Sequence, residues 1–245
     1  MAVRSKSLLL LCIFALLSSV LIYVILEDGK TLPGDPGVVL HVLQTDPSDI
    51  SLHAINENVT RSGKTGINGG FFWEGQLLSI AVNDGYPVNG KPNEYGSGWF
   101  NEKYKRGTMV YDKATKSLSV QRAASVGDLR ISDASSFWAQ GGVSMSLQEK
   151  SDWRSTAIEE EALPFPDDQR LRSAMVYDLQ GVVYLIVSST PCTAEQFRKA
   201  ILREVGAELV DGIFLDGDGS SQLLAGKKKL EGDRRKVLQM IAIVE

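Results

Sequence analysis

Cysteine and histidine are the scarcest reactive residues in this 245-residue chain. Its two cysteines are Cys12 and Cys192, and Cys12 lies inside a long apolar run, so a disulfide within one globular domain is excluded. A cysteine-based zinc site is excluded by the same count, and two histidines, His41 and His53, make any zinc site a poor expectation. The net charge of −4 is mild and gives no reason to expect nucleic acid as a partner.

One long apolar run is present, over residues 8–26, with Arg4 and Lys6 before it. Nineteen helical residues span about 28 Å, close to the thickness of a bilayer's hydrocarbon core. We therefore expect residues 1–29 to form a cytoplasmic tip and a single-pass transmembrane signal-anchor, with the rest of the chain outside the cytoplasm. The alternative is a cleaved signal peptide and a secreted protein, but no A-x-A-like cleavage site follows the run.

The rest of the chain is expected to be a linker over residues 30–37 and one domain over residues 38–245. Thr193 and Gln196 form a capping box that predicts a helix over 193–205. Segments rich in β-forming residues alternate with turns; they are 38–43, 50–55, 77–82, 107–111, 118–121, 174–177, 182–187, 210–215 and 237–244. This pattern predicts an α+β domain with a mixed, mainly antiparallel sheet and few helices.

Three segments between these elements lack clear periodicity. Residues 83–106 and 149–171 are long enough that we expect functional or mobile loops. Residues 227–236 carry basic side chains on both sides of Glu231-Gly232-Asp233, which indicates a basic hairpin tip. A solvated hairpin explains that tip most simply, and contact with an anionic polymer or lipid is the alternative.

The most informative segment is residues 213–223, IFLDGDGSSQL, in which two carboxylates and two glycines follow a buried-looking strand. Gly217 and Gly219 allow the backbone to approach a ligand closely, and successive amides in such a turn form an anion-binding concavity. Asp216 or Asp218 would then place a carboxylate beside the bound group. A tight turn whose Asp side chains satisfy their own backbone is an equally good interpretation of the spacing alone.

A second signal is Asn68 at a strand end, followed by Gly69, Gly70 and the aromatic residues 71–73. The asparagine offers both a donor and an acceptor, and the aromatic rings suit an apolar wall against a sugar ring. Packing in the core is the commoner use of two phenylalanines, so this motif alone is weak.

Two further signals lie in the second half of the chain. Arg172 enters a strand directly after a long loop, where its guanidinium fork suits a phosphate, although a solvated surface charge is the commoner role. The paired glycines Gly141 and Gly142 indicate a backbone that lies close to another group.

Together these motifs resemble the phosphodiester glycosidase family. The resemblance covers roughly residues 38–243, and its motifs occur in the family's order: 68–72 (NGGFF), 77–88 (a strand and turn), 141–142 (GG), 172–174 (RSA) and 215–221 (LDGDGSS) after a helix. Two departures stand out. Asp218 replaces the middle glycine of a Gly triplet, and Ser173 stands where threonine is usual. Asp218 adds a negative charge to the expected phosphate cradle, which requires compensation by Arg172 or by a cation.

The resemblance implies hydrolysis of a sugar-1-phosphodiester, between the anomeric carbon and the phosphate oxygen, in a glycan or cell-envelope polymer such as an exopolysaccharide. Asp216 would act as base or nucleophile, Arg172 would neutralise the phosphate, and Asn68 would position the sugar or the water. The substrate-binding residues expected from the motifs are Gly69, Gly70, Gly141, Gly142, Gly217, Asp218, Gly219, Ser220 and Ser221. No cofactor is expected, although a divalent cation near Asp216 and Asp218 stays open.

Two alternatives remain at this stage. A surface domain could bind a phosphorylated or anionic glycan without cleaving it, and Asp218 favours this reading. A Ser-His-Asp triad would need His41 or His53, both on early strands, where core or surface strand positions are commoner. The expected partners are thus the phosphorylated sugar or anionic glycan and, through the N-terminal helix, the membrane.

Overall fold

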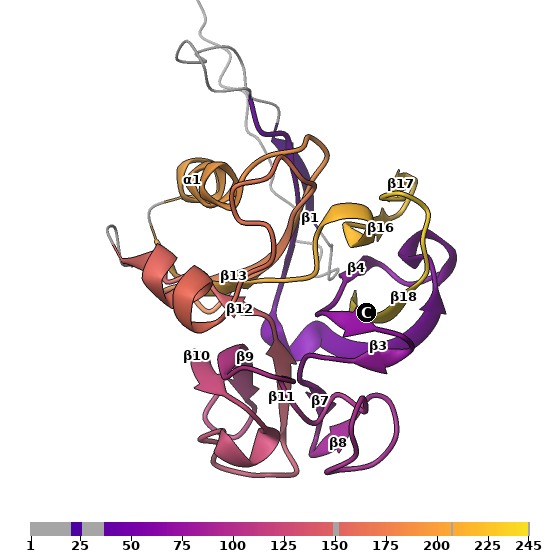
Figure 1. Cartoon of the computed structure of the whole chain (residues 1–245), viewed down its shortest axis with the longest axis vertical. Coiled ribbons are helices and arrows are strands. Elements are labelled where there is room, and N and C mark those ends of the chain that lie inside the picture. The colour runs from indigo at the N-terminus through magenta and orange to yellow at the C-terminus, as the bar shows by residue number, and fades with distance from the viewer. Residues whose placement is uncertain (1–20, 26–36, 149–151, 207, 245) are drawn as a thin grey trace, which may run out of the picture.

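Three large antiparallel sheets, one two-stranded hairpin and one α-helix form the framework of the described part of the protein (Figure 1). The computed structural model describes residues 21–25, 37–148, 152–206 and 208–244. Every strand ladder in these residues is antiparallel, which confirms the prediction of mainly antiparallel sheets with few helices.

The first sheet has six strands and carries the α-helix on one face. Its order across the sheet is β1 (Leu21–Ile25), β2 (Leu40–Thr45), β14 (Val183–Ser188), β13 (Ser173–Asp178), β15 (Leu209–Phe214) and β12 (Val143–Ser144). The helix α1 (Ala194–Glu204) connects β14 to β15 and buries Phe197 and Ile201 against this sheet. Its predicted capping box is confirmed, because Thr193 Oγ1 accepts from the Gln196 N–H and Gln196 Oε1 from the Thr193 N–H.

Two five-stranded sheets and a short hairpin complete the architecture. The second sheet runs β10 (Ser117–Ala123), β9 (Arg106–Asp112), β11 (Phe137–Gly141), β7 (Ala81–Asn83) and β8 (Tyr86–Pro87). The third runs β17 (Lys228–Leu230), β16 (Leu223–Ala225), β4 (Gly66–Asn68), β18 (Val237–Ile243) and β3 (Ile50–Glu57). The hairpin pairs β5 (Phe72–Trp73) with β6 (Gln76–Leu77).

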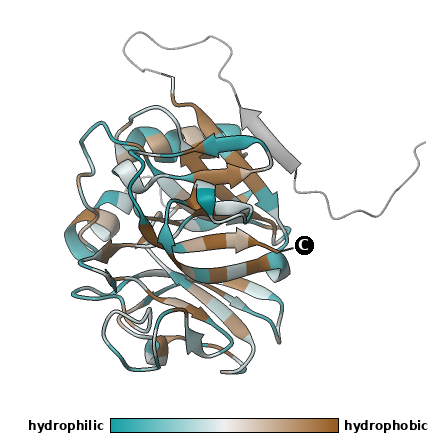
Figure 2. Cartoon of the chain, turned by 90° about the vertical axis from the view of Figure 1, so that its right-hand side faces the viewer, coloured by the Kyte–Doolittle hydropathy of each residue, from teal (hydrophilic) through white to brown (hydrophobic). Residues whose placement is uncertain are grey.

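A common core joins the sheets, because inward-facing residues of all three pack in one cluster. Ile213 comes from the first sheet, Met109 and Trp138 from the second, and Ile67 and Ile241 from the third. Apolar residues are concentrated on the strands in Figure 2, as a shared interior requires. This packing brings the ends of β4, β13 and β15 together, although they are far apart in the sequence.

Two predictions about elements were wrong. Residues 77–82 are not one strand: β6 ends at Leu77 and pairs with β5, whereas β7 begins at Ala81 and pairs with β11. The region 149–171 is not only loop, since Ser155–Glu160 form a π-helix.

The N-terminal prediction falls almost entirely outside the described residues. Of the apolar run, only Leu21–Ile25 are described, and they form strand β1 beside β2. Within the described part of the chain, no helix has the length and apolar character needed to cross a membrane. The signal-anchor therefore stays a prediction.

Candidate active site

A pocket of about 810 Å³ lies beside the ends of β4, β13 and β15. Its wall combines aromatic rings with charged side chains, which is the composition expected of a ligand site. The lining residues are Phe71, Phe72, Trp73, Glu74, Leu78, Tyr95, Glu102, Lys103, Tyr104, Arg106, Leu163, Pro164, Phe165, Arg170, Arg172, Ser173, Phe214, Leu215, Asp216, Gly217, Asp218 and Arg235.

Asp216 is the second residue after the end of β15 and lies in the pocket wall. Its backbone is held on both sides: its N–H donates to the Gly69 carbonyl at 3.2 Å, and its carbonyl accepts from Asn68 Nδ2 at 2.8 Å. Burial raises the pKa of its carboxyl to about 6, while the nearby Ser220 hydroxyl and the charge of Arg235 act in the opposite direction. A carboxyl that titrates near neutrality is suited to proton transfer or nucleophilic attack.

Ser220 lies beneath this carboxyl and is fully buried. Its hydroxyl makes no hydrogen bond of standard geometry within the described residues. A buried hydroxyl without a fixed partner is uncommon. It is therefore free to orient toward Asp216. Ser220 does not line the pocket, so the substrate-binding role expected of it stays a prediction.

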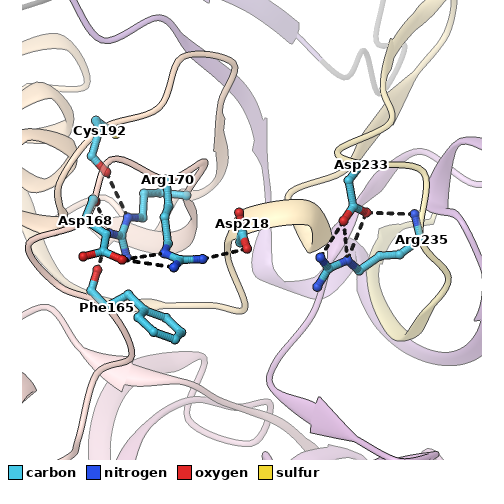
Figure 3. A network of polar contacts seen from close by, with 8 residues as sticks. Phe165, Asp168, Arg170, Cys192, Asp218, Asp233 and Arg235 are labelled. Atoms are coloured by element: carbon cyan, nitrogen blue, oxygen red, sulfur yellow. Dashed lines mark hydrogen bonds and ion pairs between the residues drawn. The ribbon is translucent and has the colours of Figure 1, made fainter.

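Asp218 occupies a backbone position that favours glycine, because its φ is +56°. Its side chain is exposed and receives Arg170 Nη1 at 2.8 Å (Figure 3). Arg170 thus compensates the negative charge of Asp218, whereas Arg172 or a cation was expected to do so. Arg170 is itself fixed, since its guanidinium lies 3.9 Å from the centre of the Phe165 ring and also pairs with Asp168.

Arg172 is buried, so the solvated-surface reading of this residue was wrong. Its Nε donates to the Cys192 carbonyl at 3.1 Å, and its Nη2 donates to the carbonyls of Phe165 and Asp168 at 2.6 and 2.9 Å. Burial lowers the pKa of the guanidinium. Most of the fork therefore holds the backbone of the pocket wall, and Arg172, which itself lines the pocket, also contributes a positive charge there.

Arg235 is a pocket residue that the sequence reasoning did not single out. Its Nε donates to Asp233 Oδ1 at 2.9 Å, and this bond, with the carboxylates of Asp218 and Asp216 nearby, raises the pKa of the guanidinium (Figure 3). Two buried amides hold its carbonyl: Asn58 Nδ2 at 3.1 Å and Gln222 Nε2 at 2.9 Å.

The predicted basic hairpin tip over 227–236 is exposed or half-buried at every residue, which agrees with the interpretation as a solvated hairpin. Lys228 and Lys229 lie on β17, whereas Asp233 packs directly on Gly219, where an added Cβ would overlap its carboxylate. The glycine at 219 is thus required for contact between the 231–235 segment and the turn. A run of charged residues gives no sequence signal that one of its exposed arginines lines a pocket.

Asn68 is buried, and its amide is fully used by the protein. Besides the bond to Asp216, its Nδ2 donates to the Gly69 carbonyl, and its Oδ1 accepts from Ser173 Oγ at 2.8 Å and from the Gln222 N–H at 3.1 Å. Ser173 Oγ also lies 3.1 Å from Ser221 Oγ, within hydrogen-bond distance. Asn68 and Ser221 thus position the end of β15 from behind, and neither lines the pocket.

The glycine pairs named from the sequence serve close packing. An added Cβ would overlap Gln239 at Gly69, Ser79 at Gly70, Asn101 at Gly141 and the Phe214 carbonyl at Gly142. None of the four lines the pocket, whereas Gly217 does. Paired glycines correctly indicated a close approach, but the approaching group is the protein itself.

Glu102 is the second pocket carboxyl with a raised pKa, and sequence reasoning missed it. Its Oε1 is buried and has no hydrogen-bond partner among the described residues. Burial raises the pKa of this carboxyl, and a hydrogen bond from the Gly96 backbone opposes the shift. The only signal in the sequence was its place in the long aperiodic segment 83–106.

Other catalytic arrangements find no support in the described part of the chain. His41 lies on β2 and His53 on β3, in different sheets, and neither lines the pocket, so no Ser-His-Asp triad forms there. No group of three or more His, Cys, Asp or Glu side chains within the described ranges is arranged to hold a metal ion.

The fold and site define an antiparallel β protein whose pocket carries two carboxyls of raised pKa beside arginines, with an aromatic wall. The phosphodiester glycosidase family model matches residues 61–244, so the chain belongs to this family. A search among curated proteins found no match.

Solved structures that resemble this protein include the following two. The catalytic domain of zebrafish N-acetylglucosamine-1-phosphodiester alpha-N-acetylglucosaminidase, auto-inhibited by its pro-peptide, is 18% identical with a TM-score of 0.60, over 93% of this chain and 82% of that one. A putative exported protein from Burkholderia pseudomallei is 14% identical with a TM-score of 0.54, over 85% and 74%. At these identities the structures support the shared fold.

Proposed function

We propose that the protein hydrolyses a sugar-1-phosphodiester, with Asp216 as the central catalytic residue. The observation that carries this proposal is a carboxyl with a pKa of about 6, held at a strand end beside Arg235 in an open pocket. Family membership supports the reaction class.

The proposed hydrolysis requires the transfer of a proton from water and no strong acid for the leaving group. Water supplies an oxygen to the anomeric carbon, the bond from that carbon to the phosphate oxygen breaks, and the leaving phosphate keeps the electron pair. Asp216 either takes the proton of the attacking water or attacks the anomeric carbon first and is then released by water; both routes need the ionised carboxylate. Because a phosphate monoester leaves with its own negative charge, neutralisation by Arg235, Arg170 and the buried charge of Arg172 matters more than a strong acid.

Glu102 is the candidate second carboxyl. Glycosidases use two carboxyl groups whose environments give them different protonation states. Burial raises the pKa of the Glu102 carboxyl, which favours the role of a hydrogen-bond donor over that of a base. Its proposed role is to donate a hydrogen bond to the phosphate or to a sugar hydroxyl.

The alternative that the protein binds a glycan without cleaving it was based on the negative charge of Asp218. Arg170 pairs with that carboxylate, so the expected repulsion against a phosphate is reduced. The substrate is proposed to be a phosphodiester in a glycan or cell-envelope polymer outside the cytoplasm, as the apolar run at residues 8–26 suggests.

The test compares the full chain with Asp216→Asn on a panel of sugar-1-phosphodiesters, with free sugar as the readout. We expect kcat/KM to fall roughly 10²-fold or more, because this is the usual contribution of acid–base catalysis. The parent should also lose activity about tenfold per pH unit below about 6, where Asp216 becomes protonated. Full activity in a folded Asp216→Asn protein would remove the mechanism.

Asp84→Asn is the matched control, because Asp84 is an exposed carboxylate that pairs with Lys113 and does not line the pocket. Its activity and pH profile should equal those of the parent. Binding without turnover across the panel would instead favour the non-catalytic reading.

A further inference from the structure

Exposed aromatic side chains gather at the pocket. Within the described residues, seven large hydrophobic side chains are exposed, and four of them line the pocket. These four, which we call the aromatic rim, are Trp73, Tyr95, Tyr104 and Phe165, with exposed fractions of 68%, 63%, 40% and 57%. Single exposed apolar residues are ordinary, but a cluster around one cavity indicates a binding surface.

The rim is assembled from separate segments of the chain. Trp73 ends strand β5, Tyr95 and Tyr104 belong to the segment between β8 and β9, and Phe165 follows the π-helix. Because these segments reach the same pocket from different parts of the fold, the rings flank it instead of forming one local patch.

At least two of the rings are held in place without a ligand. Phe165 lies under the guanidinium of Arg170, and its carbonyl accepts from Arg172 Nη2. Tyr104 lies 5.2 Å, ring centre to guanidinium carbon, from the buried Arg106. Rings fixed before binding lose little conformational freedom when a ligand arrives.

The charged side chains that lie among the aromatic rings indicate which class of ligand the rim binds. Glu74, Lys103 and Arg170 also line the pocket, so flat apolar faces alternate with charged hydrogen-bonding groups. A sugar ring has the matching character, with an apolar C–H face and hydroxyl groups around its edge. A lipid chain would need a continuous apolar surface, which these charges interrupt.

We propose that the aromatic rim binds sugar units of a glycan chain that carries the scissile phosphodiester, so that the preferred substrate is an oligosaccharide or polysaccharide and not a small diester. This proposal rests on the proposed function for the cleavage step. The binding of sugar units by the rim does not depend on it.

The binding test uses the full chain with Asp216→Asn, which removes turnover. Neutral oligomers of glucose, mannose, galactose and N-acetylglucosamine, one to six units long, are titrated by calorimetry and by tryptophan fluorescence. We expect affinity to rise with chain length for at least one sugar, and Trp73→Ala and Tyr95→Ala each to weaken it about 5- to 10-fold, the range of one lost aromatic contact. Both residues are more than half exposed, so the variants should fold.

Tyr86→Ala is the matched control, because Tyr86 is 72% exposed and does not line the pocket. It should leave the affinity unchanged. No length-dependent binding by any oligomer, or equal losses in Tyr86→Ala and Trp73→Ala, would overturn the proposal. Rim-dependent binding of phospholipid vesicles in place of the oligomers would overturn it as well.

The activity arm separates this proposal from the proposed function. On diesters attached to one sugar or to a longer chain, the parent should show higher kcat/KM for the longer chain, and Trp73→Ala should abolish that difference. If both diesters turn over equally and Trp73→Ala changes nothing, the rim proposal fails while the hydrolase stands. If the oligomers bind through the rim but no diester is turned over, the rim proposal is supported and the proposed hydrolase function is contradicted.

Discussion

Two aspartates separated by one residue have different environments in this protein. Asp216 lies against the protein interior, where burial raises the pKa of its carboxyl to about 6. Asp218 is exposed, paired with Arg170, and held at a positive φ. The sequence correctly indicated this turn as part of the site, but it could not show which of the two carboxyls is buried.

Replacing Asp218 with glycine tests its charge. Glycine relieves a left-handed backbone cost of about 1 kcal/mol, and the lost exposed ion pair is worth about as much or less, so stability should change little. We expect KM for an anionic diester to fall several-fold, because one negative charge leaves the pocket and Arg170 is released from it. The measurement is steady-state kinetics at low and at 0.5 M salt, where screening should shrink the difference. An unchanged KM at low salt would mean that Asp218 does not face the phosphate.

At the scale of elements, one wall of the pocket is a segment without regular periodicity. Residues 152–171 are held by buried arginines: Arg172 donates to the carbonyls of Phe165 and Asp168, and Arg106 donates to those of Glu161 and Ala162. The segment was predicted as a functional or mobile loop. These bonds indicate a fixed wall, not a lid.

Arg172→Lys should loosen this wall. Lysine keeps the charge, but it cannot reproduce a fork that serves three carbonyls, so we expect a loss of about 2–4 kcal/mol in the free energy of unfolding and a higher KM. Chemical denaturation measures the first effect, and limited proteolysis within 152–171 should become faster. Arg61→Lys, at an exposed arginine outside the pocket, is the control. Equal stability of the two variants would contradict the wall role.

Helices and strands could be predicted where neighbouring residues in the sequence determine them, and could not be predicted where tertiary contacts do. The helix after Thr193 and most strands followed from capping and from β-rich runs, because both are properties of neighbouring residues. The sequence could not show that residues 77–82 belong to two strands, because the composition of this segment is uniform. The two strands differ only in their partners, since β6 pairs with β5 and β7 pairs with β11. Arg235 and Glu102 were missed for the same reason, because tertiary contacts bring them to the pocket.

At the scale of the whole molecule, His41 makes stability depend on pH. It is buried on β2 with Nε2 2.9 Å from Ser189 Oγ; burial, with Lys228 adding to it, lowers its pKa to about 4. The unfolded chain binds this proton near pH 6.5, so unfolded molecules carry more protons between pH 6.5 and 4, and stability should fall by roughly 2–3 kcal/mol across that window. Asp216 acts in the opposite sense, because its raised pKa makes the folded state bind the extra proton below about 6.

The measurement is urea unfolding at pH 7 and pH 4.5 in the Asp216→Asn background, which removes the opposing contribution. His41→Gln cannot titrate and should lose most of the pH dependence in this window. If the free energy of unfolding still falls between pH 7 and pH 4.5 when both Asp216→Asn and His41→Gln are present, other groups cause the acid sensitivity.

The pairing of β18 with both β3 and β4 has a consequence for the order of folding. Met240 lies opposite Asn68, so the strand end that holds Asp216 is completed by residues near the end of the described chain. Contacts between such distant segments form late and slowly, because a long loop must close before they stabilise anything. A nascent chain from which residues 237–243 have not yet emerged therefore cannot complete the third sheet, so the site stays unformed until β18 is available to pair.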